Sequence, residues 1–253
     1  MYFTKTMATK VLTNITKFEN ELDDLFKKYN QDLRQNLGRR NALVSQYQES
    51  TVAEVLREVF DNVIEDGAPG KPDVQILDIQ KELECKLTSG SKSKGSVSYS
   101  LQTDWRTICK KGSLDYLYIL ADEKFENFCV LFFEGLTSND FFPPAAGSRG
   151  KSRMRKASAM KKCTVLHGGA VNLRLEFIKR YEDKVAELNE DCYHEVSVML
   201  TKCTQADLTV ENAGQKIKAI EERYEKKIAQ YQKRIEKWKT NTDRWSYKFS
   251  PVS

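Results

Sequence analysis

The sequence predicts an α/β protein in which a mixed β-sheet is flanked by helices, with further helical segments at both ends. Two observations indicate this class. Apolar residues recur at helical spacing near both ends of the chain, while the middle holds four short apolar or alternating runs bounded by turn residues. The run at 127–136 is almost entirely apolar, as expected for a central strand that is covered on both faces.

The N-terminal part is expected to be helical over residues 8–50, with a second helix over 50–67. In the first segment the apolar positions at helical spacing are Val11, Leu12, Ile15, Phe18, Leu22, Leu25 and Phe26. In the second helix, Ser50 or Thr51 is the expected N-cap, and Glu54 lies three residues after Thr51 as in a capping box. Gly67 is expected to end this helix.

The middle of the chain predicts strands at 73–79, 82–87, 114–122 and 127–136, with a short helix within 99–112. Residues 137–170 contain a Pro-Pro pair and several glycines. They indicate a long loop with one strand at 163–167, and a loop of that length in a compact domain is usually functional or disordered.

Helical spacing returns at 172–200 and again at 213–240. From Tyr224 to Trp238 the apolar positions follow steps of 4, 3, 4 and 3 residues, which is a heptad seam. Two interpretations stay open for this seam. The helix packs within its own chain, for example as a hairpin with 172–200, or it forms a coiled coil with another chain.

We therefore expect a single domain over residues 1–253. Its expected parts are a helical N-terminal part at 1–49, a core at 50–170 that includes the loop at 137–170, and a helical C-terminal part at 171–253 that can serve in dimerisation.

Composition restricts the functional class. The 253-residue chain is 40% hydrophobic and 30% charged, which is typical of a globular protein with a charged surface, and no apolar run is long enough to span a bilayer. Six cysteines without a CxxC pair, and an N-terminus without a secretory signal, predict a cytoplasmic protein. With only two histidines, catalysis is expected to use carboxylates, lysine or a metal held by oxygen.

A candidate catalytic motif lies in the stretch GKPDVQILDIQKELECKL, from Gly70 to Leu87. Because side chains alternate along a strand, Glu84 and Lys86 share one face, and pairing of the two strands as a hairpin brings Asp73 near Glu84. Two carboxylates can hold Mg²⁺, and a neighbouring lysine can orient water or stabilise developing negative charge. The alternative is a solvent-exposed hairpin with ordinary ion pairs.

Two other acids in this stretch are less suitable. Asp78 can replace Asp73 only with a short spacing to Glu84, and Glu82 in place of Glu84 would leave the lysine four positions away.

The sequence resembles the PD-(D/E)xK nuclease superfamily and, within it, the type II restriction endonucleases, through Pro72-Asp73 and Glu84-Cys85-Lys86. The resemblance covers roughly residues 50–136 and implies a restriction-endonuclease-like core. It implies that Asp73, Glu84 and Lys86 are catalytic and that the two acids hold Mg²⁺, for which Mn²⁺ can substitute.

The resemblance also implies a third acid, on the helix before the hairpin. Glu54 is the first choice for this catalytic role, and Glu58, one turn later, is the second. Gln102 is a weaker candidate for the glutamine that some relatives carry on the helix after the ExK strand.

A basic segment follows the expected core. Residues 147–162 hold seven basic residues and no acidic one, which indicates an anionic partner or a disordered solvated loop. Arginine can read guanine through paired hydrogen bonds, and lysine suits phosphate. The expected DNA-binding residues are Arg149, Lys151, Arg153, Arg155, Lys156, Lys161 and Lys162.

The expected function is therefore that of a Mg²⁺-dependent type II restriction endonuclease, which cuts double-stranded DNA at a short specific site, generally as a homodimer. Two alternatives stay open. One is another nuclease of the same superfamily, in DNA repair or recombination. The other is a non-catalytic DNA-binding or coiled-coil protein in which Asp73 and Glu84 are ordinary surface acids.

Overall fold

The computed structural model describes residues 1–68, 71–93, 96–148, 150–205 and 210–252. Within these ranges the chain divides into two compact units. The first comprises residues 1–170 and 247–253, and the second comprises residues 171–246. The division falls where the sequence predicts the start of the C-terminal helical part.

The first unit is built on a mixed β-sheet with the order β1-β2-β3-β7-β8-β10, and a short strand, β13, also pairs with β8. The pair β3–β7 is parallel, and the other pairs described in this sheet are antiparallel. The strands are β1 (Val63–Glu65), β2 (Val74–Ile76), β3 (Lys81–Ser89), β7 (Ser113–Ala121), β8 (Asn127–Thr137), β10 (Cys163–His167) and β13 (Ser250–Pro251). The predicted α/β class with a mixed sheet is confirmed.

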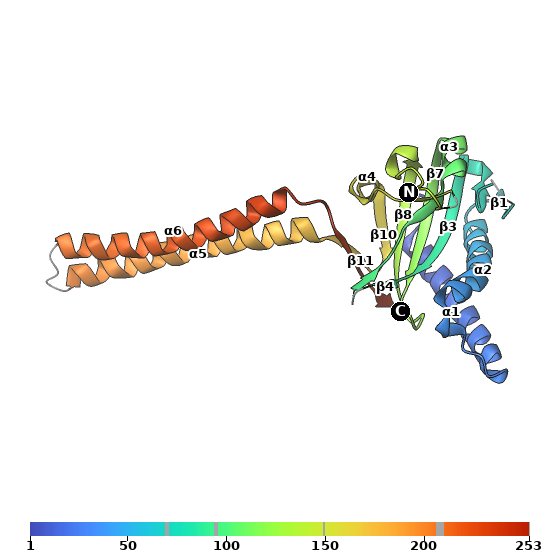
Figure 1. Cartoon of the computed structure of the whole chain (residues 1–253), viewed down its shortest axis with the longest axis horizontal. Coiled ribbons are helices and arrows are strands. Elements are labelled where there is room, and N and C mark those ends of the chain that lie inside the picture. Colours follow the sequence, from blue (N-terminus) through green and yellow to red (C-terminus); the bar gives the residue numbers. More distant parts are fainter. Residues whose placement is uncertain (69–70, 94–95, 149, 206–209, 253) are drawn as a thin grey trace. The chain divides into compact units, whose positions relative to one another are not determined.

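Helices α1 (Lys5–Lys28) and α2 (Leu37–Arg57) pack on one face of this sheet, as Figure 1 shows in blue. Their apolar stripes meet every second residue of the strands, and the resulting core includes Leu12 of α1, Val52 of α2, Leu83 of β3 and Phe132 of β8, each completely buried. Burying such apolar side chains contributes about 1.5–3 kcal/mol each to stability. Side chains that point to the opposite face of the strands lie away from α1 and α2.

The helix boundaries differ from those predicted. The first helix ends at Lys28, and α2 runs through Ser50 and Thr51 instead of starting there. Thr51 is completely buried against the core, whereas the side chain of Asn36 caps α2 by accepting a hydrogen bond from Arg39 N at 3.1 Å. The predicted last turn of the second helix is strand β1, because its backbone pairs with β2.

The region expected to be a long loop, 137–170, contains several short elements. They are η3 (Ser138–Asp140), β9 (Lys151–Arg153), α4 (Lys156–Ala159), η4 (Met160–Lys162), the predicted strand β10 and the first residues of β11 (Gly169–Asn172). Strand β9 pairs with β6 (Gln102–Asp104), which precedes the short helix α3 (Trp105–Lys111). The described elements are completed by η1 (Leu33–Gln35), η2 (Leu77–Ile79), β4 (Ser91–Ser93) and β5 (Ser96–Ser98).

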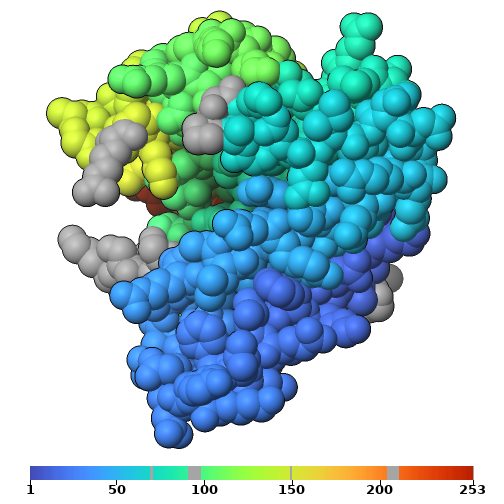
Figure 2. Space-filling model, turned by 90° about the vertical axis from the view of Figure 1, so that its right-hand side faces the viewer, coloured from blue at the N-terminus to red at the C-terminus, as the bar shows by residue number. Residues whose placement is uncertain are grey.

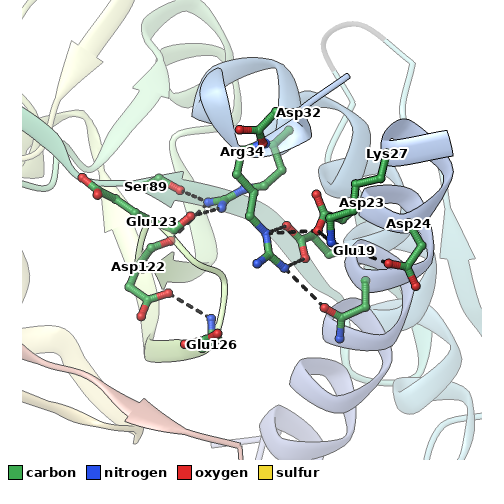
Figure 3. A network of polar contacts seen from close by, with 12 residues as sticks. Glu19, Asp23, Asp24, Lys27, Asp32, Arg34, Ser89, Asp122, Glu123 and Glu126 are labelled. Atoms are coloured by element: carbon green, nitrogen blue, oxygen red, sulfur yellow. Dashed lines mark hydrogen bonds and ion pairs between the residues drawn. The ribbon is translucent and has the colours of Figure 1, made fainter. Parts of the chain in front are cut away.

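A buried arginine joins α2 to the turn between β7 and β8. Arg40 donates hydrogen bonds to the carbonyl oxygens of Glu123 at 2.6 Å and Asp122 at 3.2 Å, and to Ser89 Oγ at 2.7 Å. Figure 3 shows Ser89, Asp122 and Glu123 on one side of this region, and Arg34 facing Glu19 of α1 on the other. These bonds hold α2 against the sheet at a fixed position.

The second unit is a helical hairpin made of α5 (Leu173–Gln205) and α6 (Val210–Lys239). Residues of the predicted seam face α5: the ring of Trp238 stacks on Phe177 with centroids 4.6 Å apart, and Tyr231 lies 5.9 Å from Tyr181. The seam is therefore used within the chain, as in the hairpin interpretation. Strand β11 pairs with β12 (Trp245–Lys248) in a separate two-stranded sheet.

Across the described ranges, none of the helices combines the length and the apolar character that crossing a membrane requires.

Candidate active site

Asp73, which directly precedes β2, lies together with Glu84 and Lys86 of β3. Strand β2 pairs with β3 in the register Val74 opposite Leu83, which sets Asp73 across from Glu84. The backbone N–H of Cys85 donates a hydrogen bond to Asp73 Oδ2 at 2.7 Å, so the carboxylate is fixed against β3. Because Leu83 and Cys85 point into the core on the helix side, Glu84 and Lys86 point to the other face of the sheet.

Lys86 lies between the two carboxylates. Its ammonium Nζ is 2.6 Å from Glu84 Oε1 and 3.5 Å from Asp73 Oδ2. The parallel pairing with β7 supports this arrangement, since it sets Glu84 beside Tyr116 and Lys86 beside Tyr118, two fully buried tyrosines. The predicted trio is thus brought together in one place.

Burial and charge act in opposite directions on this trio. Burial raises the pKa of Glu84, and the charge of Lys86 opposes that increase. Burial alone would lower the pKa of Lys86, but the carboxylates of Glu84 and Asp73 raise it above its ordinary value. Lys86 therefore carries its charge throughout the neutral range, and it neutralises part of the charge of the two acids.

Glu49 of α2 interacts electrostatically with Asp73, Lys86 and Glu84. Burial raises its pKa to about 7, and the negative charge of Asp73 adds to the increase. Glu54, the first choice from the sequence, is exposed, and Glu58 forms an ion pair with Lys10 of α1. The structure therefore does not bring Glu54 or Glu58 to the trio, and Glu49 is the acid of α2 whose pKa is affected by the charges of Asp73, Lys86 and Glu84.

Glu49 was not among the predicted acids because the helix before the hairpin was expected to begin at residue 50, whereas α2 spans Leu37–Arg57. Once α2 is continued towards its N-terminus, Glu49 falls on the same stripe as Val52, Ala53 and Leu56, at steps of three, four and seven residues. Those three residues are buried. A glutamate at helical spacing from buried apolar residues is the sequence signal from which Glu49 could have been identified.

The other acids that were considered have separate partners. Asp78 accepts hydrogen bonds from the backbone N and side chain of Asn62, at 2.9 Å and 2.7 Å. Glu82 pairs with Lys111 at 2.6 Å. Both carboxylates are therefore bound to residues outside the trio.

A cavity of about 390 Å³ opens beside Glu84 and Lys86. Its other walls include Asp104 of β6, Tyr118 of β7 and Lys151 of β9. Gln102 also lines the cavity, but from strand β6 and not from a helix as expected. Figure 2 looks onto the side of α1 and α2 and shows a recess between these helices, in blue, and the segment around residue 155, in yellow.

The basic segment 147–162 is only partly available to a ligand. Lys156 donates a hydrogen bond to Tyr99 O at 3.1 Å, and Lys162 pairs with Asp140 at 2.9 Å. Arg155 lies over the ring of Phe142, 4.5 Å from its centroid. Five basic residues of the segment are nevertheless exposed: Lys151, Arg153, Arg155, Lys161 and Lys162. Arg149 lies outside the described residues.

Comparison with known proteins gives no family for this chain. No family model matches the sequence, and no curated protein matches it.

The trio can be examined for its fit to Mg²⁺. Within the described residues no group of three or more His, Cys, Asp or Glu side chains is arranged to hold a metal ion. Mg²⁺ does not need such a group, because it usually binds one or two protein carboxylates and keeps several waters. Glu84 Oε2 is buried without a hydrogen-bond partner among the described residues, so this carboxylate oxygen is open to a ligand such as a hard cation. These donors fit Mg²⁺.

Proposed function

We propose that this chain is a Mg²⁺-dependent endodeoxyribonuclease that hydrolyses phosphodiester bonds of double-stranded DNA. The observation that carries the proposal is the position of the Lys86 ammonium, at 2.6 Å from the carboxylate of Glu84 and 3.5 Å from that of Asp73, beside an open cavity. An ordinary surface ion pair does not bury a glutamate oxygen without a partner, as happens at Glu84 Oε2.

The residues of the site have separate roles in this proposal. Asp73 and Glu84 would hold Mg²⁺, which when bound polarises the scissile phosphate and lowers the pKa of water. Lys86 is charged at neutral pH, so it can donate hydrogen bonds to a phosphate oxygen that gains negative charge in the transition state. Glu49, with a pKa of about 7, can exchange a proton near neutral pH and is the proposed third acid.

DNA is the proposed substrate because cations border the cavity. Lys151 lines it, and Arg153 and Lys161 are exposed in the same basic segment. Each phosphate contact of this kind makes binding salt-dependent. We further propose type II activity by a homodimer, since two sites related by a two-fold axis match a palindromic DNA site.

A second candidate is a nuclease of the same superfamily that recognises the form of DNA in repair or recombination. The contacts that the basic segment 147–162 makes within the chain favour this second candidate. The Arg155 guanidinium lies over the ring of Phe142 and donates a hydrogen bond to Phe141 O at 2.9 Å. Lys156 and Lys162 form hydrogen bonds to other residues of the chain. Fewer side chains are then free to read base edges.

Incubation of the full chain with circular plasmid and Mg²⁺ distinguishes these possibilities. Discrete bands support a site-specific restriction enzyme, and a smear supports the second candidate. If the plasmid stays intact over a range of enzyme and Mg²⁺ concentrations, the proposed nuclease activity is wrong, and a non-catalytic DNA-binding protein is favoured.

A further inference from the structure

A second cavity adjoins the candidate active site and has no role in the reaction proposed above. Its volume is about 690 Å³, within the range of about 300–1,000 Å³ that is typical of ligand pockets. Ser100 and Lys151 line both cavities, so the two cavities are neighbours.

An exposed aromatic ring lines this second cavity. Phe142 is 51% exposed, which is unusual for a phenylalanine. Its backbone N–H donates to Arg153 O at 2.8 Å, and the Arg155 guanidinium lies 4.5 Å from the ring centroid. Arg155 is held in turn by its hydrogen bond to Phe141 O. The ring is therefore fixed in place and still accessible, as required of a surface on which a planar group stacks.

The charge of the cavity suits an anion. Lys151, Arg153 and Lys156 contribute to its walls, and none of the described residues lining it is acidic. Lys156 is kept in position by its hydrogen bond to Tyr99 O and by the ring of Tyr247, 5.0 Å from its ammonium. An exposed aromatic ring among cations is the combination with which proteins bind unpaired nucleotides.

We propose that this cavity receives one unstacked nucleotide of the DNA strand, next to the phosphodiester at Asp73, Glu84 and Lys86. The base stacks on Phe142. Lys151, which borders both cavities, contacts the phosphate that links this nucleotide to the scissile bond. The placement beside a scissile bond rests on the proposed function, whereas stacking of a base in the cavity does not.

This arrangement makes the form of the DNA important for affinity. Taking a base out of a duplex costs free energy, and the cost is lowest where the base is already unpaired. The protein is therefore expected to prefer a duplex with one unpaired nucleotide over the fully paired duplex of the same sequence.

The test measures binding of the full chain to two short fluorescent duplexes in EDTA, without metal. One duplex is fully paired, and the other carries a single bulged 2-aminopurine. We expect the bulged duplex to bind about tenfold more tightly, because stacking of one base on an aromatic side chain is worth a factor of that order. Phe142→Leu should remove most of the preference, and Phe142→Tyr should retain it. Emission of the bulged 2-aminopurine depends on what the base stacks on, so it should change on binding to the wild type and change less on binding to Phe142→Leu.

Tyr29→Leu is the matched control, because Tyr29 is 72% exposed at the end of α1 and lines neither cavity. It should leave the preference unchanged. Equal binding of the two duplexes by the wild type would overturn the proposal, and so would an unchanged preference in a folded Phe142→Leu protein. The wild-type comparison needs no variant, so it decides the matter even if Phe142→Leu fails to fold.

The binding test and the cleavage test have separate outcomes. Plasmid cleavage with Mg²⁺ but no preference for the bulge would reject the nucleotide cavity and leave the nuclease proposal intact. A preference that depends on Phe142, without any cleavage, would reject the nuclease proposal and leave the stacking site.

Discussion

The backbone N–H of Cys85 donates a hydrogen bond of 2.7 Å to Asp73 Oδ2. This bond couples the core to the candidate active site. The Cys85 side chain packs into the core on the helix side of the sheet, and its neighbours Glu84 and Lys86 therefore face the other way. Packing that fixes the register of β3 consequently also fixes the distance between the two acids.

Replacing Asp73 by Asn is expected to abolish cleavage while keeping the fold. The amide oxygen can still accept the Cys85 hydrogen bond, but the negative charge that would hold Mg²⁺ is gone. We expect the rate of plasmid cleavage to fall by about a hundredfold or more, since a bound metal contributes several kcal/mol to the barrier reduction. Asp78→Asn is the control, because Asp78 is exposed and bound to Asn62. Cleavage by Asp73→Asn at the wild-type rate would show that the site is assigned incorrectly.

Replacing Lys86 by Met should make stability depend on Mg²⁺. Without the ammonium, the carboxylates of Glu84 and Asp73 repel each other in a largely buried position. Removing one partner of such a buried pair costs about 3–5 kcal/mol, and less where solvent reaches it. Added Mg²⁺ should restore part of this loss, so the Tm of the variant should rise with Mg²⁺ more than that of the wild type.

The control for that experiment is Lys111→Met. Lys111 forms a comparable 2.6 Å pair with Glu82 of the same strand, but away from the trio. Its Tm should respond to Mg²⁺ as the wild type does. A response of Lys86→Met no larger than that of Lys111→Met would contradict a Mg²⁺ site at these acids.

Replacing Glu49 by Gln should change how stability depends on pH. Burial raises the pKa of Glu49 in the folded protein from the ordinary 4.5 to about 7. Between these two values the folded state binds more protons than the unfolded state, so the wild type loses stability as the pH rises through this range. The variant lacks this loss. Because Glu49 is only half-buried and solvent screens part of the effect, the variant should gain on the order of 1–3 kcal/mol relative to the wild type above pH 7, and the gain should vanish below pH 4.5.

Urea unfolding in EDTA across this pH range measures the effect of Glu49→Gln. Glu54→Gln is a matched control, since Glu54 is exposed on the same helix. Parallel pH profiles of the wild type and Glu49→Gln would contradict the raised pKa.

Gly168 is expected to tolerate no side chain. Its φ is +68°, and an added Cβ would fall well inside contact distance of the carbonyl oxygens of Lys248 and Phe128. Gly147 has a similar φ of +79°, but nothing lies within 4 Å of its Cβ position. Gly168→Ala should therefore cost about 3 kcal/mol or more, and Gly147→Ala only about 1–2 kcal/mol, the cost of the left-handed backbone. Equal Tm values for the two variants would show that the packing around Gly168 can relax.

Much of the sheet was predictable because strands depend on local patterns. The four predicted strands correspond to β2, β3, β7 and β8, and the fifth, 163–167, is β10. Alternation within Leu83 to Lys86 is a property of extended backbone, and it placed Glu84 and Lys86 on one face before any partner strand was known. The helix starts were less predictable. Capping at Ser50 or Thr51 contributes about 1 kcal/mol, and packing of the longer apolar stripe of α2, which includes Val44, Val52 and Leu56, outweighs it.

The sequence by itself therefore determined the α/β class and the common face of Glu84 and Lys86, since both follow from spacing along one chain segment. The tertiary structure alone decided that Glu49 is half-buried and affected by the charges of the trio while Glu54 is exposed, and that the seam of α6 packs on α5. It also decided that Lys156 and Lys162 are bound within the chain. These outcomes depend on burial and on charges brought together from distant segments, and the spacing of residues along a single segment does not determine such contacts.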